Sequence, residues 1–341
     1  MKLLKRFYYS STRFLPLQFL LRTSPVKSVF PYHHIVSDEE VPHISNLYPY
    51  KNTVEFKKDL EFLLKRFEPI HPTDLISFIE NHNRLPEKKF LLTFDDGFKE
   101  IYEVVAPILK SKGVSAIFFI NPAFIDNKEM FYRNKISVLL GEIKKQNQPS
   151  ILKRIAEIIS TPSEEYGEIR DALLKVKQAN KEKLDEVATV LELSFEDYLR
   201  KKRPWLTTPE LKELSSQGFY LGGHSWNHPY YQSLPFNEQV KQTIDSCSYV
   251  KQFQNHKTTF AFPHFDTDLS QKLFDRLLKT EHKIDLLFGT QNQKNEIQNK
   301  MIHRFNCERP GLPIDQHIKG ILLYSILQKL SNKQNIIRKH A

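Results

Sequence analysis

Two short stretches hold side chains whose types and spacing suit hydrolytic chemistry. The first, Leu91 to Gly97, is an apolar run that stops at two adjacent acids and a glycine. The second, Tyr220 to Pro229, carries His224 and His228 just after two glycines. Residues four apart on a helical turn lie on the same side, so both imidazoles can reach one ion. With one carboxylate they form a three-ligand set that leaves a position open for water.

The elements around the first stretch predict where its acids lie. Phe90 to Phe94 reads as a short buried strand, and Gly97 lets the chain turn. Helical periodicity covers residues 54–67 and 98–112, and residues 114–120 form the next apolar strand. Such alternation predicts parallel strands, whose carboxyl ends carry the chemistry in α/β folds.

The motifs Thr93-Phe94-Asp95-Asp96-Gly97 and His224-Ser225-Trp226-Asn227-His228 resemble the polysaccharide deacetylase family. Its members carry NodB-homology domains and are also called family 4 carbohydrate esterases. The first motif matches the family signature fully, and the second matches its His-Ser/Thr-x-x-His form. The resemblance implies an α/β fold, a distorted (β/α) barrel of the NodB-homology type. It also implies metal-dependent removal of an N-acetyl, less often an O-acetyl, group from a carbohydrate.

The barrel is predicted from two segments, residues 26–132 and 204–310. Between them, residues 133–203 are rich in Lys, Glu, Leu and Ile and carry no strand pattern. They predict a helical insertion over the barrel mouth, with a role either in substrate recognition or as a scaffold extension. A basic and aromatic segment precedes the barrel (1–25), and a helix with a basic tail follows it (311–341).

The resemblance implies roles for the motif residues. Asp96, His224 and His228 would bind one divalent transition metal ion, for which Zn²⁺ is the first choice and Co²⁺, Ni²⁺ or Fe²⁺ also fit. Asp95 would be the general base that takes a proton from water. Arg304 would orient Asp95, as an arginine does in relatives, or else form a surface salt bridge.

The proton donor has two candidates, His303 and His33. The family usually takes it from a Leu-x-His motif near the C-terminus, which is not cleanly present here. His303 lies on a late predicted strand, as the usual order requires. His33 follows Tyr32 and resembles the Tyr-His pair of the poly-N-acetylglucosamine deacetylase branch, whose late motifs are permuted to the front. We favour His33, and a buried structural histidine is the alternative for either residue.

Four further residues are predicted to contact the sugar. Tyr48 and Trp226 offer rings that can stack on it. Phe262 and Pro263 end a Phe-Ala-Phe-Pro stretch that resembles the family's third motif, which lines the groove and donates a backbone N–H to the oxyanion. The residues that follow Pro263 depart from the family, and its Asp-Trp motif is absent.

Composition limits the partners. The net charge of +10 favours acidic partners, but no basic-aromatic recognition motif points to nucleic acid. Two cysteines favour a reducing compartment. Residues 1–22 lack the apolar core and cleavage site of a signal peptide, and no run approaches the roughly 18 residues that span a bilayer. Their basic and aromatic side chains predict either contact with an anionic membrane surface or a helix packed on the barrel.

We therefore expect a cytoplasmic protein, free or peripheral on the inner membrane face. Its acetylated carbohydrate substrate would be a lipid-linked or nucleotide-linked glycan in surface polysaccharide or glycolipid synthesis. The alternatives are a catalytically inactive carbohydrate-binding pseudoenzyme and a metal hydrolase of non-peptide C–N bonds in small molecules. The sequence does not set the oligomeric state.

Overall fold

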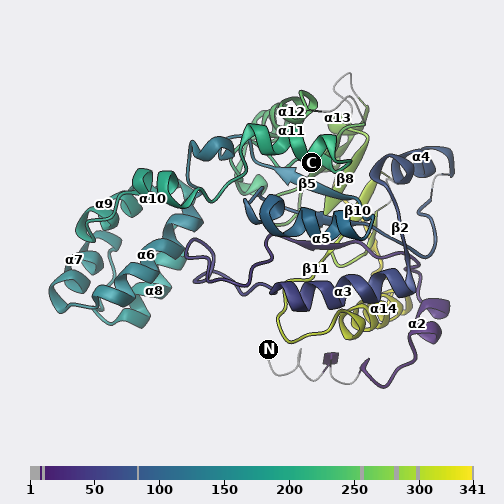
Figure 1. Cartoon of the computed structure of the whole chain (residues 1–341), viewed down its shortest axis with the longest axis horizontal. Helices are drawn as coiled ribbons and strands as arrows, with labels where there is room; N and C mark the ends of the chain where they lie inside the picture. The colour runs from purple at the N-terminus through teal and green to yellow at the C-terminus, as the bar shows by residue number, and fades with distance from the viewer. Residues whose placement is uncertain are drawn as a thin grey trace.

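Eight short parallel strands form a nearly closed barrel, in the order β10-β8-β7-β6-β5-β4-β1-β11 (Figure 1). The structure is a computed structural model that describes residues 8–9, 12–82, 84–253, 257–279, 284–296 and 300–339. The barrel strands are β1 Pro31–His33, β4 Leu92–Phe94, β5 Ala116–Ile120, β6 Tyr220–Gly223, β7 Thr259–Ala261, β8 Leu286–Gly289, β10 Met301–His303 and β11 Phe305–Asn306. This architecture confirms the predicted distorted (β/α) barrel.

Helices cover the outer face of the barrel. They are α2 Leu17–Thr23, α3 Thr53–Arg66, α4 Pro72–His82, α5 Ala106–Ser111, α11 Thr208–Ser216, α12 Phe236–Lys251, α13 Gln271–Lys279 and α14 Ile314–Leu330. A π-helical turn, Ile101–Val105, precedes α5. Helix α3 shows why these segments are helical: Asn52 and Glu55 form a capping box, and one face buries Phe56, Leu60 and Leu63.

Two small sheets flank the barrel. Strand β2 (Glu68–Pro69) pairs with β3 (Lys89–Phe90), and β9 (Asn295–Glu296) pairs with β12 (Asn335–Ile336). Near the start of the barrel only Pro31–His33 forms strand β1, and Val29 adds an isolated bridge to Phe90. Short strands leave their flanking residues free to form the barrel's loops.

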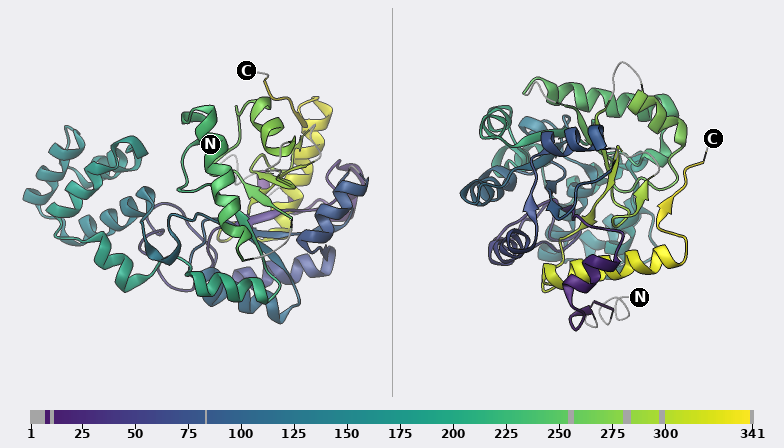
Figure 2. Two further views of the ribbon diagram at one scale, coloured as in Figure 1. Left: turned by 90° about the horizontal axis from the view of Figure 1, so that it is seen from above. Right: turned by 90° about the vertical axis from the view of Figure 1, so that its right-hand side faces the viewer.

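Five consecutive helices between β5 and β6 project to one side of the barrel (Figures 1 and 2). They are α6 Tyr132–Gln146, α7 Pro149–Ile159, α8 Tyr166–Lys175, α9 Glu182–Val190 and α10 Phe195–Lys202. Their buried residues share a core with loop residues of the barrel. Asn46, in the loop after β1, donates both its backbone N–H and its side-chain amide to Ser137 of α6. That loop therefore ties the helical insertion to the barrel.

The barrel closes where the chain crosses from one edge of the sheet to the other, at Arg304. The Arg304 backbone N–H donates to the Gly289 carbonyl (2.8 Å), and that of Phe305 donates to Phe30 (3.2 Å). The Gln293 side chain completes the seam by accepting from the Phe30 N–H and donating to the Ser28 carbonyl. The backbone thus changes its pairing partner from β8 to β1 at Arg304, and the side chain of this residue enters the barrel.

Candidate active site

Arg304 and Asp95 form a buried two-pronged ion pair inside the barrel. Arg304 Nη1 lies 2.6 Å from Asp95 Oδ1, and Nη2 lies 2.8 Å from Oδ2. Nη1 also donates to Thr93 Oγ1. Burial alone would raise the pKa of Asp95, but Arg304, together with His224 and His34, outweighs it, and the pKa lies below its ordinary value. Asp95 is thus held ionised and in one orientation, and Arg304 is not a surface residue.

Asp96 lies within reach of both motif histidines. Its Oδ1 is 3.4 Å from His224 Nε2 and 3.2 Å from His228 Nε2, and all three side chains are buried. The turn after β4 makes this possible: Asp96 has φ +75° and Gly97 has φ +78°, a conformation that glycine adopts without strain. The two adjacent acids can therefore face different partners.

The three residues fit a divalent transition metal ion. Their ligand atoms all lie within 4.8 Å of one another. His224 Nδ1 donates to the Ala261 carbonyl (2.8 Å), which leaves the lone pair of Nε2 directed toward Asp96. Burial lowers the pKa of His228, so this imidazole is neutral, as a metal ligand must be. Two nitrogens and one oxygen form a donor set that Zn²⁺ accepts.

His303 belongs to a different cluster. Its Nε2 is 3.1 Å from Glu296 Oε2, and Arg338 Nη2 lies 2.7 Å from Asp266 and 2.8 Å from Glu296. Asp266, Glu296 and His303 also have ligand atoms close enough for an ion, but Arg338 already supplies the positive charge there. Neighbouring strand residues point to opposite sides, so with Arg304 inward His303 faces outward. This position does not suit the predicted role of proton donor.

His33, the favoured proton donor, lies in the core instead. Its ring stacks on Phe94 and meets Phe56 edge-on, and neither ring nitrogen has a hydrogen-bond partner among the described residues. Burial holds its pKa well below the ordinary value. His33 pairs in register with Phe94, which faces out of the barrel, and the adjacent His34 takes the inward side. His33 is therefore not placed to reach the two acids, whereas the next residue is.

His34 is the histidine that faces the two acids. Its imidazole interacts electrostatically with Asp95 and Asp96, and its Nδ1 lies 2.5 Å from Glu308 Oε2. Glu308 Oε1 also accepts the backbone N–H groups of His34 and Ile35. Burial alone would lower the pKa of His34, but Glu308 outweighs it and raises the pKa to about 10. The imidazole is therefore held protonated, with part of its surface exposed.

Of the predicted sugar-contacting residues, Tyr48 lies nearest the acids, with its ring 5.3 Å from that of His34. Trp226 is 39% exposed, but its ring meets Tyr249 of α12. The prediction for Phe262 is wrong. Its side chain is buried in the core behind β7, so it cannot line a groove, and its backbone N–H donates to the Phe288 carbonyl, so it cannot bind an oxyanion. Pro263 is buried as well.

An aromatic wall that the sequence did not predict stands beside His228. The rings of Phe131 and His264 lie 4.7 and 4.4 Å from that of His228, and Tyr230 stacks on His264 at 3.7 Å. His264 is the first residue where the chain departs from the family's third motif, and this departure was the available signal. Nothing local in the sequence pointed to Glu308 or Phe131.

The comparisons with known proteins agree with the family resemblance and with the fold. Residues 82–158 match the polysaccharide deacetylase family model, a span that includes Asp95 and Asp96 but not the two histidines. The resemblance indicated by the motifs is thereby confirmed. A comparison with curated proteins found no match.

Solved structures of deacetylases share the fold. The Streptococcus pyogenes deacetylase PplD in complex with acetate has a TM-score of 0.55 at 16% identity, over 87% of this chain and 99% of that one. IcaB from Ammonifex degensii has a TM-score of 0.52 at 15% identity, over 87% and 98%. A de-N-acetylase from Aggregatibacter actinomycetemcomitans has a TM-score of 0.50 at 16% identity, over 85% and 99%.

The metal site is tested by the metal content of the purified protein. We expect about one equivalent of a divalent transition metal after reconstitution, because the three ligand atoms of the cluster lie close enough together to bind one ion. The variants His224→Ala and His228→Ala should lose it. His303→Gln is the matched control, since it alters the other candidate cluster and should keep the metal. Elemental analysis decides the matter: metal lost from His303→Gln, or none bound by the wild type, would contradict this assignment.

Proposed function

We propose that this chain, which matches the polysaccharide deacetylase family and shares the fold of solved deacetylases, is a metal-dependent hydrolase that removes an N-acetyl group from a carbohydrate. One observation carries the proposal. An ionised carboxylate, Asp95, is locked by Arg304 directly beside Asp96, His224 and His228. A protein that only binds sugar has no use for a base held next to a metal-ligand set.

Amide hydrolysis needs an activated water, a stabilised oxyanion and a proton for the departing amine. Asp96, His224 and His228 would hold a divalent ion, which would lower the pKa of water and polarise the acetyl carbonyl. Asp95 accepts the water proton at a carboxylate oxygen, and Arg304 keeps that oxygen in place. The water oxygen bonds to the acetyl carbon, His34 donates a proton to the amine nitrogen as the C–N bond breaks, and acetate and a free amine result.

Acetate release from N-acetylated amino-sugar oligosaccharides tests this function directly. The metal-loaded wild type should release acetate, and Asp95→Asn should lower kcat by about 10²- to 10⁴-fold, the usual contribution of a positioned acid or base. Because Asn keeps the shape of Asp, the variant should retain its metal. Equal rates in the two proteins would refute the role of Asp95, and no acetate from any such sugar would refute the function.

The proton donor is tested by the pH dependence of kcat/KM, which reports the free enzyme's acid and base. The active form of His34 is protonated, so activity falls as pH rises through its pKa, near 10 in the wild type. Glu308→Gln removes the charge that raises this pKa, and the falling limb should move to lower pH by at least one unit. His33→Gln should leave the limb in place. If the falling limb moves in His33→Gln, or stays fixed in Glu308→Gln, His34 is not the proton donor.

We further propose that the protein acts at the cytoplasmic face of a membrane, on a lipid-linked or nucleotide-linked glycan. Helix α2 lies against α14 along one side of the barrel (Figures 1 and 2). Four large apolar side chains on these segments are exposed, namely Phe14 (78%), Phe19 (57%), Leu327 (49%) and Leu330 (77%). Residues 12–37 and 316–339 contain Arg and Lys but no acid. Exposed apolar side chains on segments that carry basic but no acidic residues suit an anionic bilayer surface.

None of the described helices is long and apolar enough to cross a bilayer.

Co-sedimentation with lipid vesicles tests the membrane contact. The wild type should pellet with vesicles that contain an anionic phospholipid, much less with purely zwitterionic ones, and less at high salt because the attraction is screened. The pair Phe14→Ser and Phe19→Ser should release it. Val54→Ser is the control, since Val54 is 57% exposed on α3, outside this face. Binding that ignores lipid charge, or survives the double change, would contradict the proposed contact.

A further inference from the structure

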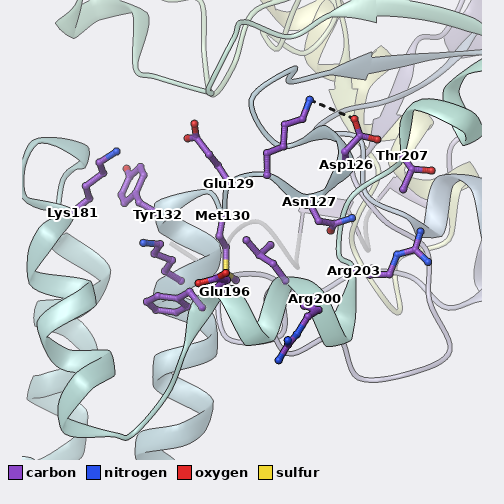
Figure 3. A pocket seen from close by; sticks show the side chains of 14 residues that line it. Asp126, Asn127, Glu129, Met130, Tyr132, Lys181, Glu196, Arg200, Arg203 and Thr207 are labelled. Atoms are coloured by element: carbon purple, nitrogen blue, oxygen red, sulfur yellow. Dashed lines mark ion pairs between the residues drawn. The ribbon is translucent and has the colours of Figure 1, made fainter.

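A cleft with a volume of about 770 Å³ lies between the barrel and the helical insertion, separate from the metal cluster (Figure 3). Its barrel side is the loop after β5 and its insertion side is α10 with the start of α9. The volume is within the range of pockets that bind small organic ligands. Figure 3 shows Lys181 and Tyr132 at one end of the cleft and Arg203 at the other.

The floor of the cleft is apolar and partly aromatic. Met130 and Leu199 are buried beneath it, and the rings of Tyr132 and Phe195 line it. Lys135 Nζ lies 4.7 Å from the centre of the Phe195 ring and pairs with Asp185, so that cation is already engaged. Flat apolar surfaces of this kind receive the C–H face of a pyranose ring.

The rim carries charged side chains without partners. Glu129, Lys181, Glu196 and Arg203 line the cleft and form no ion pair with any other residue in the described part of the chain. Two acids balance two cations, so an ionised ligand would gain little here. Carboxylates accept and cations donate, which matches the hydroxyl groups around an uncharged sugar.

Two adjacent residues connect the wall of the cleft to the metal cluster. Phe131 contacts the His228 ring at 4.7 Å, and the next residue, Tyr132, lines the cleft and meets Phe131 edge-on at 5.0 Å. The Tyr132 hydroxyl also interacts electrostatically with that of Tyr230, whose ring stacks on His264 beside His228. A chain molecule with one unit over the metal cluster can therefore lay its neighbouring units across this wall.

We propose that this cleft is a subsite for the uncharged sugar units that flank the unit being deacetylated. The substrate would then be an oligosaccharide or longer glycan, not a single sugar or a small amide. This inference rests on the proposed function, and it gives the helical insertion a role in substrate recognition.

Chain-length dependence of kcat/KM tests the subsite. On N-acetylated amino-sugar oligosaccharides of one to six units, the wild type should gain at least tenfold as the chain reaches the cleft. The double variant Glu196→Ala, Arg203→Asn should lose most of that gain and keep the wild-type rate on the shortest substrate. Asn suits the positive φ of Arg203 (+46°), so the change adds little strain. Glu192→Ala with Lys201→Ala is the control, because both residues are exposed but lie outside the cleft.

Binding gives a readout that does not depend on turnover. In an Asp95→Asn background, calorimetric titration with the six-unit oligosaccharide should show a dissociation constant at least fivefold higher once the two cleft residues are changed. Failure of the wild type to release acetate would sink the deacetylase function alone, since this titration still reports on the cleft. An unchanged dissociation constant, a rate independent of chain length, or an equal loss on every length would overturn the subsite.

Discussion

The structure depends on one buried interaction, the two-pronged pair between Arg304 and Asp95. Arg304 is fully buried, at the point where the chain leaves β8's edge of the barrel and joins β1. The rings of Tyr32, Phe119 and Phe288 surround its guanidinium at 4.7, 5.2 and 5.8 Å. Removing one partner of such a pair typically costs about 3–5 kcal/mol, because an uncompensated charge stays buried. The closure of the barrel and the orientation of the Asp95 carboxylate therefore depend on the same interaction.

A second charged pair, Glu308 and His34, lies nearby and favours the protonated form of its titratable group. Arg304 keeps Asp95 deprotonated, and Glu308 keeps His34 protonated. Two titratable groups whose surroundings push their pKa values apart are the mark of an acid and base assignment. The residue that favours the charged form of each group, Arg304 or Glu308, lies beside the last barrel strands, β10 and β11. Asp95 and His34, the proposed reacting groups, follow the early strands β4 and β1. Hydrolysis of an amide needs both states at once, at the same pH.

Sequence reasoning predicted what is local. Thr93 to Gly97 predicted the strand, the turn and both acids, and His224 with His228 predicted the other two members of the candidate metal cluster. These histidines lie on an irregular bend with positive φ at Ser225 and His228, not on the helical turn that was expected. The sequence-based prediction failed where the outcome depended on which face of a strand a residue occupies, or on a contact between residues far apart in the chain. His33 and His34 differ only in which side of β1 they face, and that depends on pairing with Thr93 and Phe94. Glu308 lies 274 residues from His34 in the chain, and no local pattern links them.

The helical insertion shows how a local departure from a family pattern becomes part of a site. It starts at α6, directly after the loop from β5, so its placement is tied to a strand of the barrel. Phe131 is the last residue before α6, and its ring is held against His228. Packing of α6 against the loop after β1 fixes the same junction from the other side. The insertion cannot shift without moving an aromatic contact of the metal-ligand set, so its position relative to the reacting groups is built into the fold.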